Sequence, residues 1–274
     1  METETSENKK IAVIGAGHIG KAFVEGLINS NFKSENIIIT CRTNKKLKDI
    51  GLAYKVNSTT DNIKAAKWAD LIVIAVKPKD VNKVLSEIKK FIDGKTIISM
   101  AAGISISVLK DFLNEETQKI IRIMPNIPIA TNDGVIGFFA AKNISNKEKK
   151  DTLRFLSRFG LVINLKLEKE LDILTLISGC GPGIVANLIK LFSSYSRVLK
   201  MDKKTNEVIA LQTFLGTTNY LIRKKITAKD LEKSVATKGG ITKTILKSLE
   251  HQKFSIIFFR AMTDGYLKLK HLLK

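Results

Sequence analysis

The stretch that decides the fold lies near the start of the chain and reads Ile11-Ala12-Val13-Ile14-Gly15-Ala16-Gly17-His18-Ile19-Gly20. A short apolar run enters a G-x-G-x-x-G loop, and apolar residues then recur at helical spacing as far as Ser30. Such a strand, glycine turn and helix hold a dinucleotide pyrophosphate, because the glycines allow a tight turn, a close approach of the backbone and close helix packing. The first N–H groups of the helix complete an anion site. We therefore predict that Gly15, Ala16, Gly17, His18, Ile19 and Gly20 bind a dinucleotide. The alternative is a glycine-rich turn without a ligand.

Short apolar runs follow this stretch at intervals and predict further buried parallel strands. They are Ile37–Thr40, Leu71–Val76, Thr96–Ser99 and Ile120–Met124, with Val135–Ala140 and Leu161–Asn164 extending the sheet. Amphipathic segments such as Val81–Phe91 and Ser105–Leu113 lie between them, and we expect Ser105 to cap its helix. The alternation predicts an α/β fold built on a Rossmann-type doubly wound sheet.

The pattern changes near Leu165, after which helical segments replace the strand rhythm. The predicted helices are Leu171–Lys200, Asn206–Lys224, Ala228–Val235, Ile241–Glu250 and Phe254–Leu272, with breaks at Gly179–Gly183 and Thr237–Gly240. We therefore predict a nucleotide-binding domain over residues 1–164 and an all-helical domain over residues 165–274.

Composition narrows the class of protein. A chain of 274 residues with 44% hydrophobic residues can form two domains with a sizeable core. The two cysteines, Cys41 and Cys180, lie far apart, which suggests no disulfide framework and favours a reducing, cytoplasmic location. The three histidines, His18, His251 and His271, show no metal-ligand spacing, so we predict no metal site.

Neither a membrane nor a nucleic acid is an expected partner. The segment Met1–Lys10 lacks the apolar core of a signal peptide. The longest uncharged run, Ile173–Ile189, contains glycines and a proline, which indicates a buried, interrupted helix and not a membrane span. The formal net charge of +20 could indicate a nucleic-acid partner, but the lysines are spread along the chain and favour solvated helix faces.

The tip of the second predicted strand bears on the cofactor. In this fold an acidic residue there usually binds the ribose 2′-hydroxyl of NAD, whereas a nearby arginine accommodates the 2′-phosphate of NADP. The strand ends instead on Thr40-Cys41-Arg42-Thr43-Asn44-Lys45. We therefore predict NADPH rather than NADH, with Arg42, Thr43 and Lys45 as donors. Alternatively, Arg42 stacks on the adenine or faces water. The predicted cofactor-binding residues also include Asn57.

Further motifs stand in order along the chain. They are Ala75-Val76-Lys77-Pro78, Ser99-Met100-Ala101-Ala102-Gly103-Ile104-Ser105, Arg122-Ile123-Met124-Pro125-Asn126, Ser178-Gly179-Cys180-Gly181-Pro182 and Thr237-Lys238-Gly239-Gly240-Ile241-Thr242. With the glycine loop, they resemble the pyrroline-5-carboxylate reductase family from about Lys10 to Leu269. The last three are similar to the R-x-M-P-N, S-G-x-x-P and S-P-G-G-T-T segments of that family.

The resemblance implies an enzyme that closes proline biosynthesis by NAD(P)H-dependent reduction of the cyclic imine 1-pyrroline-5-carboxylate to L-proline. It also implies a helical domain that interleaves with its partner in a homodimer, and larger rings of dimers; the alternative is an intramolecular helical core. Ala75, Val76, Lys77, Pro78, Met100, Ala101 and Ala102 would then border the cofactor. Gly239, Gly240, Lys238 and Asn126 would lie at the substrate, a small cyclic imino acid, and Thr242 is the expected catalytic side chain.

The chain departs from the family pattern at the substrate end. Lys238 replaces a proline, Ile241 replaces the first of two threonines, and Lys190 stands where a glutamate is usual. Lys238 adds a positive charge near the expected carboxylate site, which could offset the lost hydroxyl. These changes leave open a related imine or keto-acid reductase with another substrate, or a catalytically weak homologue that acts as a binding or sensing protein.

Overall fold

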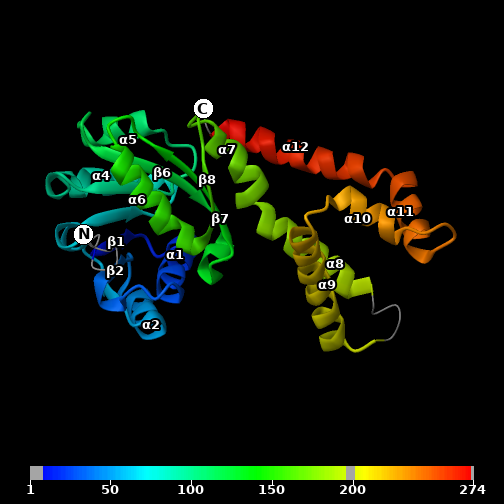
Figure 1. Ribbon diagram of the computed structural model, residues 1–274. Helices are drawn as coiled ribbons and strands as arrows, with labels where there is room; N and C mark the ends of the chain where they lie inside the picture. Colours follow the sequence, from blue (N-terminus) through cyan, green and yellow to red (C-terminus); the bar gives the residue numbers. More distant parts are fainter. Residues whose placement is uncertain (1–8, 196–200, 273–274) are drawn as a thin grey trace. The chain divides into compact units, whose positions relative to one another are not determined.

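The computed structural model describes residues 9–195 and 201–272 (Figure 1). The predicted helix end at Lys200 and the segment Met1–Asn8 lie outside these residues. The chain divides into two compact units, Met1–Pro182 with Leu272–Lys274, and Gly183–His271. The first unit thus extends beyond residue 164, where the sequence placed its end, because the helix α7 (Glu170–Leu174) packs on the strand β7 (Gly134–Ala140).

The first unit is built on a sheet whose described strands run in the order β3-β2-β1-β4-β5-β6-β7-β8. Neighbouring strands are parallel except β6 and β7, which are antiparallel. The strands are β1 (Ile11–Ile14), β2 (Ile37–Thr40), β3 (Asn57–Thr59), β4 (Leu71–Ile74), β5 (Thr96–Ser99), β6 (Lys119–Pro125), β7 (Gly134–Ala140) and β8 (Gly160–Asn164). The chain order reverses at β1 and β4, which makes this the doubly wound sheet that the sequence predicted.

The apolar runs predicted the strands to within a few residues because most of these strands are covered on both faces. All residues of β1 and β2 are buried, and so are those of β4 and β5 after the first residue. The short edge strand β3 escaped prediction because its residues, Asn57, Ser58 and Thr59, are polar and only partly covered.

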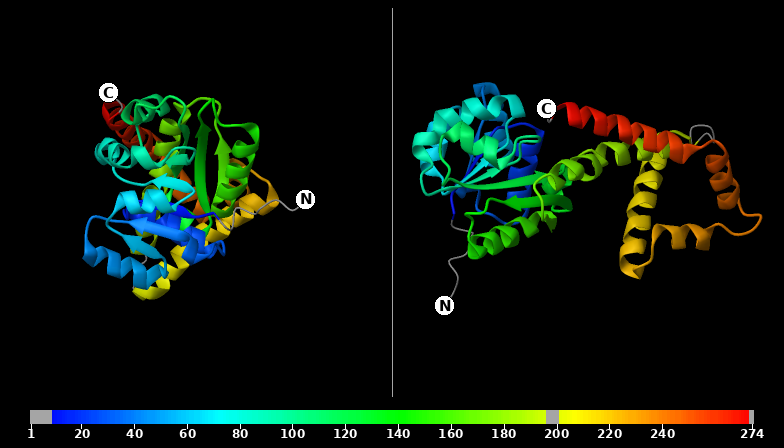
Figure 2. Two further views of the ribbon diagram at one scale, coloured as in Figure 1. Left: turned by 90° about the vertical axis from the view of Figure 1, so that its left-hand side faces the viewer. Right: turned by 90° about the horizontal axis from the view of Figure 1, so that it is seen from above.

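Helices cover both faces of the sheet, as the two views of Figure 2 show. Right-handed crossovers place the helices that precede the reversal and those that follow it on opposite faces. The helices of this unit are α1 (His18–Asn29), α2 (Asn44–Tyr54), α3 (Asn62–Trp68), α4 (Pro78–Ile88), α5 (Ile106–Leu113), α6 (Asn146–Leu156) and α7, with the short turns η2 (Ser34–Asn36), η3 (Lys89–Phe91), η4 (Ile127–Thr131) and η5 (Ser157–Phe159). As predicted, the Ser105 side chain caps α5 by accepting from the Val108 N–H group.

Aromatic stacking fixes α1 against the end of α6 and the turn η5 that follows it. The Phe23 and Phe159 rings are stacked with centroids 4.6 Å apart, and Phe155 meets both rings edge to face. Both Phe23 and Phe159 are fully buried. This cluster joins residues more than a hundred positions apart, so it holds the glycine loop at the start of α1 in a fixed place.

The second unit contains helices that bury little of each other within one chain. They are α8 (Gly181–Tyr195), α9 (Lys203–Lys224), α10 (Ala228–Val235), α11 (Ile241–His251) and α12 (Phe254–Leu272), which follow a π-helical turn η6 (Thr175–Gly179). Large apolar side chains such as Phe192, Leu215 and Phe259 are more than half exposed. The absence of strands after β8 agrees with the predicted helical domain, for the described residues.

The apolar segment Glu170–Tyr195 is interrupted by η6, as predicted, but it is not buried. Among the described residues, it alone is long and apolar enough to span a membrane by length and composition. Only 6% of its most apolar 18-residue stretch is buried. The prediction of a buried helix was therefore wrong for a single chain, because α8 contributes no buried residue.

A capping box and an ion pair tie α6 to the sheet. The Ser145 side chain accepts from the Glu148 N–H group, and the Glu148 carboxylate accepts from the Ser145 N–H group at 2.9 Å. The same carboxylate lies 2.5 Å from the Lys119 Nζ on β6. The Lys119 and Ser145 hydrogen bonds lower the pKa of Glu148 from 4.5 to about 2.

We predict that Glu148→Gln lowers the free energy of unfolding by up to about 1 kcal/mol near neutral pH, the worth of a partly exposed ion pair, because glutamine can still accept from the Ser145 N–H group. The depressed pKa means that this stabilisation is present above about pH 4.5 and is lost as the pH falls toward 2. Urea unfolding from pH 7 to 2.5 measures it. A difference between wild type and variant that is constant over this range contradicts the assignment.

Candidate active site

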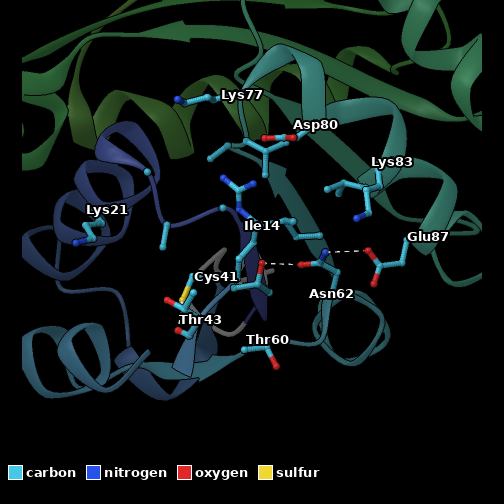
Figure 3. A pocket seen from close by; sticks show the side chains of 18 of the residues that line it. Ile14, Lys21, Cys41, Thr43, Thr60, Asn62, Lys77, Asp80, Lys83 and Glu87 are labelled. Carbon is cyan, nitrogen blue, oxygen red and sulfur yellow. Dashed lines mark hydrogen bonds between the residues drawn. The ribbon is translucent and has the colours of Figure 1, made fainter. Parts of the chain in front are cut away.

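A cavity of about 940 Å³ opens at the carboxyl ends of β1, β2 and β4, where the strand order reverses (Figure 3). This crevice is where open α/β sheets bind their ligands. The lining includes nine of the predicted cofactor-binding residues, namely Gly15, Ala16, Gly17, His18, Arg42, Thr43, Ala75, Val76 and Lys77. Its volume lies at the upper end of the range for small-molecule sites, which suits a ligand as long as a dinucleotide.

The turn between β1 and α1 is possible only with glycine at two positions. Gly15 has φ +115°, and a Cβ there would lie 2.8 Å from the Ala75 carbonyl carbon and oxygen. A Cβ on Gly20 would lie 2.0 Å from the Gly15 carbonyl oxygen. The first glycine therefore serves the turn and the second serves the packing of α1, as the motif predicts.

Gly17 differs, because the protein itself leaves room for a side chain there. The nearest atom to a Cβ on Gly17 is the Ala75 carbonyl oxygen at 4.0 Å, and its φ of −74° suits any residue. Gly17 caps α1 without a side-chain hydrogen bond, and the first turn of α1 holds no acidic residue. The N–H groups that begin the helix thus remain available to an anion, which fits the pyrophosphate of a dinucleotide.

Charged side chains surround the cavity with a net positive charge. Lys21, Arg42, Lys77 and Lys83 line it, against Asp80 and Glu87. In Figure 3 Lys21 lies on the α1 side and Lys83 on the α4 side. Positive groups on facing walls favour a ligand with several phosphates.

The tip of β2 offers donors and no acid. Arg42 and Thr43 are exposed and line the cavity, and the Cys41 thiol donates to the Thr43 carbonyl oxygen at 3.2 Å. An arginine fork in this place can bind a phosphate through two N–H groups.

Several predicted cofactor residues do not line the cavity. Ile19, Gly20 and Pro78 are neighbours of lining residues, and Lys45 is exposed on α2. Asn57 lies at the start of β3, away from the carboxyl ends of the strands, and its amide donates to the Glu35 carbonyl oxygen at 2.8 Å. A residue at the amino end of a parallel strand is placed away from the crevice, so the structure gives Asn57 no role there.

Met100, Ala101 and Ala102 follow β5 at the same edge of the sheet. Met100 donates its N–H to the Ile74 carbonyl oxygen at 3.0 Å, and Ala101 donates to the buried Ser99 hydroxyl at 3.3 Å. This turn therefore lies next to the end of β4, one strand further from the glycine loop, but it does not line the cavity.

A buried ion pair holds the helix that follows this turn. The Glu168 carboxylate accepts from the Ile106 N–H group at 2.7 Å and lies 2.8 Å from the Arg122 guanidinium. Arg122 is also 4.0 Å from Asp172, and burial raises the pKa of that carboxyl despite the arginine. These contacts join β6, α5 and α7, next to the Met100–Ala102 turn that is predicted to border the cofactor.

Asn126 is largely committed to the fold. Its side-chain oxygen accepts from the Val135 N–H group at 2.8 Å, and its own N–H donates to the Val135 carbonyl oxygen. It is buried and does not line the cavity, which leaves only its amide nitrogen for a substrate.

The remaining predicted substrate residues lie in the second unit, at the start of α11. Gly239 has φ +79°, and Gly240 caps α11 while donating its N–H to the Thr237 carbonyl oxygen at 3.0 Å. Lys238 and Thr242 are exposed, and the Thr242 hydroxyl makes no hydrogen bond among the described residues. A tight glycine turn before a helix with no acid in its first turn can bind a carboxylate.

Sequence reasoning missed part of the cavity wall, namely Lys21, Thr60, Asn62, Asp80, Lys83 and Glu87. Asn62 opens α3 directly after its cap, Asp61, whose carboxylate accepts from the Lys64 N–H group. The polar run after the missed strand β3 was the available signal, since it too follows the carboxyl end of a strand. Lys83 and Glu87 stand one turn apart on α4 and carry no motif.

Two family models match separate parts of the chain. Residues 10–103 match the model described as NADP oxidoreductase coenzyme F420-dependent, and residues 168–272 match that of pyrroline-5-carboxylate reductase dimerisation. The first of these matches agrees with a nicotinamide-dependent enzyme.

Named relatives cover both units. The chain is 30% identical to the pyrroline-5-carboxylate reductase of Methanosarcina acetivorans, over 97% of this chain and 98% of that protein. It is 29% identical to the crystal structure of the Plasmodium falciparum pyrroline carboxylate reductase with NADP bound, with a TM-score of 0.89 over 98% of this chain and 99% of that one. The Coxiella burnetii pyrroline-5-carboxylate reductase is 28% identical, with a TM-score of 0.84 over 97% and 99%. The chain belongs to the pyrroline-5-carboxylate reductase family.

Proposed function

We propose that this chain reduces 1-pyrroline-5-carboxylate to L-proline with NADPH. The observation that carries the proposal is the likeness to named pyrroline-5-carboxylate reductases over nearly the whole of both chains. The cavity at the strand reversal supplies the matching physical feature, because it combines an open helix N-terminus with basic side chains.

The glycine loop would hold the pyrophosphate. The free N–H groups at the start of α1 face an oxygen-rich anion, while Gly17 leaves space for it to approach the backbone. Lys21, on the second turn of the same helix, lines the cavity and adds a positive charge. These features fit the group without any metal ion.

The adenosine end favours NADPH over NADH. Arg42 and Thr43 line the cavity at the tip of β2, and no acidic residue follows that strand to accept from a ribose 2′-hydroxyl. A guanidinium is well matched to a 2′-phosphate, whereas it gains little from a neutral hydroxyl.

The Gly239–Gly240 turn would bind the substrate carboxylate. Backbone N–H groups at the start of α11 can accept an anion without a basic side chain. Lys238 is exposed beside this turn and would add the charge that the family's proline lacks. The free hydroxyl of Thr242, in the first turn of α11, is our choice for the group that contacts the substrate carboxylate or its ring nitrogen.

The chemistry asks little acid–base work of the side chains. A bound nicotinamide supplies the hydride, which forms the new C–H bond at the imine carbon while the C=N π electrons pass to nitrogen. A protonated iminium becomes a neutral amine in this step, and the amine then takes a proton from water. The chain's main task is therefore to orient the imino acid, with the reacting atoms about 3–3.5 Å apart.

We also propose that the second unit forms a homodimer, and that dimers can build larger rings. Its helices leave Phe192, Leu215 and Phe259 more than half exposed within one chain. Exposed apolar surface on this scale marks an association site. The match of residues 168–272 to a dimerisation model supports a second copy as the occupant.

A cytoplasmic location without a nucleic-acid partner suits this assignment. Cys41 and Cys180 lie far apart in the sequence, which favours a reducing compartment. The basic side chains that line the cavity have a sufficient role in binding a phosphate-rich cofactor.

We predict that the purified protein, mixed with pyrroline-5-carboxylate and NADPH, consumes NADPH and forms proline in equal amounts. Thr242→Ala should lower kcat/KM for the imine by about tenfold or more, the worth of a hydrogen bond to a charged group. Its affinity for NADPH should stay within about twofold of wild type, because the residue lies outside the cofactor cavity.

Thr244→Ala is the matched control. The Thr244 hydroxyl lies on the same helix and bonds to the Gly240 carbonyl oxygen at 3.3 Å, so its loss tests α11 without touching Thr242. Absence of turnover in a wild type that binds NADPH contradicts the proposed reaction. If the protein instead turns over another cyclic imine or keto acid but not pyrroline-5-carboxylate, its substrate differs from that of the family. The departures from the family pattern at Lys238, Ile241 and Lys190 would then explain the difference.

We predict that Arg42→Ala raises the KM for NADPH by about tenfold or more and that for NADH by less than about twofold. The guanidinium can bind the 2′-phosphate, which only NADPH carries. Steady-state kinetics with both dinucleotides measure the two effects. Lys33→Ala is the control and should change neither value appreciably, because Lys33 is an exposed cation that precedes η2 and does not line the cavity. An equal loss with both dinucleotides would remove Arg42 from 2′-phosphate recognition.

A further inference from the structure

A chain of hydrogen bonds crosses the cavity wall between three elements. The Thr40 hydroxyl at the end of β2 donates to the Asn62 side-chain oxygen at 2.7 Å. The Asn62 amide nitrogen, at the start of α3, donates to the Glu87 carboxylate on α4 at 3.0 Å. Figure 3 shows the Asn62 side chain facing Glu87, and Thr40, Asn62 and Glu87 all line the cavity.

The chemistry of these groups fixes the orientation of the Asn62 amide. A carboxylate only accepts hydrogen bonds, so the atom that faces Glu87 must be the amide nitrogen. The amide oxygen must then face Thr40, whose hydroxyl proton is committed to it. Asn62 keeps one N–H and one oxygen lone pair for a ligand. The hydrogen bonds to Thr40 and Glu87 fix the directions in which this N–H and this lone pair point.

Asn62 stands where the adenosine ribose is expected. It lines the cavity beside Thr40, Arg42 and Thr43, at the carboxyl end of β2. In this fold the ribose hydroxyls meet the tip of the second strand, where this chain has no acid to bind them. An oriented amide N–H is suited to the ribose oxygens of either dinucleotide.

We propose that Glu87 is a positioning residue for cofactor binding, which acts by holding the Asn62 amide so that its free N–H faces the adenosine ribose. The proposal rests on the dinucleotide role of this cavity, but not on the identity of the imine substrate. It assigns a function to an exposed acid on α4 whose charge, taken alone, would oppose an anionic ligand.

Charge and positioning make opposite predictions for Glu87. If the carboxylate acts only through its charge, its removal should tighten NADPH binding, since Lys83 one turn earlier would then be left unopposed. If it positions Asn62, loss of the acceptor should weaken binding. Glu87→Gln keeps an acceptor oxygen without the charge, whereas Glu87→Met has a similar length and no acceptor.

The test is titration of NADPH and NADH fluorescence with the purified full chain. We expect Glu87→Met to raise both dissociation constants by about two- to tenfold, as for one lost hydrogen bond. Glu87→Gln should stay within about twofold of wild type. In an Asn62→Ala background, Glu87→Met should have no further effect, because the group that it positions is gone.

Four outcomes overturn the proposal. Tighter binding by both Glu87 variants assigns the residue to charge alone. An effect of Glu87→Met that persists in full without Asn62 shows that it does not act through the amide. If Glu87→Met binds both dinucleotides as tightly as wild type does, Glu87 has no positioning role, but the proposed cofactor role of the cavity stands. If the wild-type protein binds neither dinucleotide, the proposed cofactor role is overturned as well.

Discussion

The close contact between the Gly15 carbonyl oxygen and Gly20 is the constraint on which the first unit and its cavity depend. A single Cβ at Gly20 would lie 2.0 Å from that oxygen, so α1 can begin where it does only without one. A Cβ on Gly15 would likewise lie 2.8 Å from the carbonyl carbon and oxygen of Ala75, the residue that follows the neighbouring strand β4. The stacked rings of Phe23 and Phe159 then hold the helix down. Together these contacts direct the unpaired N–H groups of α1 into the crevice between β1 and β4.

The parts that sequence predicted well are those where a local pattern and tertiary packing agree. Strands such as Ile11–Ile14 and Thr96–Ser99 are continuous apolar runs because both faces of the sheet are covered. The strand β3 was missed because an exposed edge lets Asn57 and its neighbours stay polar. The boundary at residue 164 stays a prediction. The match to the dimerisation model begins at residue 168, whereas the compact unit runs to Pro182 because Leu171 and Leu174 pack beside Gly137 and join α7 to the sheet.

In the candidate site, too, the residues that a local pattern marks were predicted, and those that only tertiary packing brings together were missed. The glycine loop and Arg42 are local signals at a strand end, and both line the cavity. Glu87 and Lys83 come from α4, and only the crossover of the chain brings that helix to the adenosine side. Asn57 was predicted to bind the cofactor, but Asn62, a few positions along, is the residue that lines the cavity, because it follows the carboxyl end of β3. The sequence likewise could not show that the apolar side chains of the second unit are exposed, because these residues follow the same helical spacing as a buried face.

We interpret the glycine loop as a dinucleotide site and not merely as a tight turn. Gly17 separates the two, because its backbone and surroundings accept a methyl group in the free protein. The direct measurement is NADPH affinity by fluorescence titration, beside the free energy of unfolding, for wild type and Gly17→Ala. We expect Gly17→Ala to weaken NADPH binding by more than about tenfold and to change the free energy of unfolding by about 1 kcal/mol or less, the cost of alanine at a helix cap. Unchanged affinity in the folded variant would contradict it.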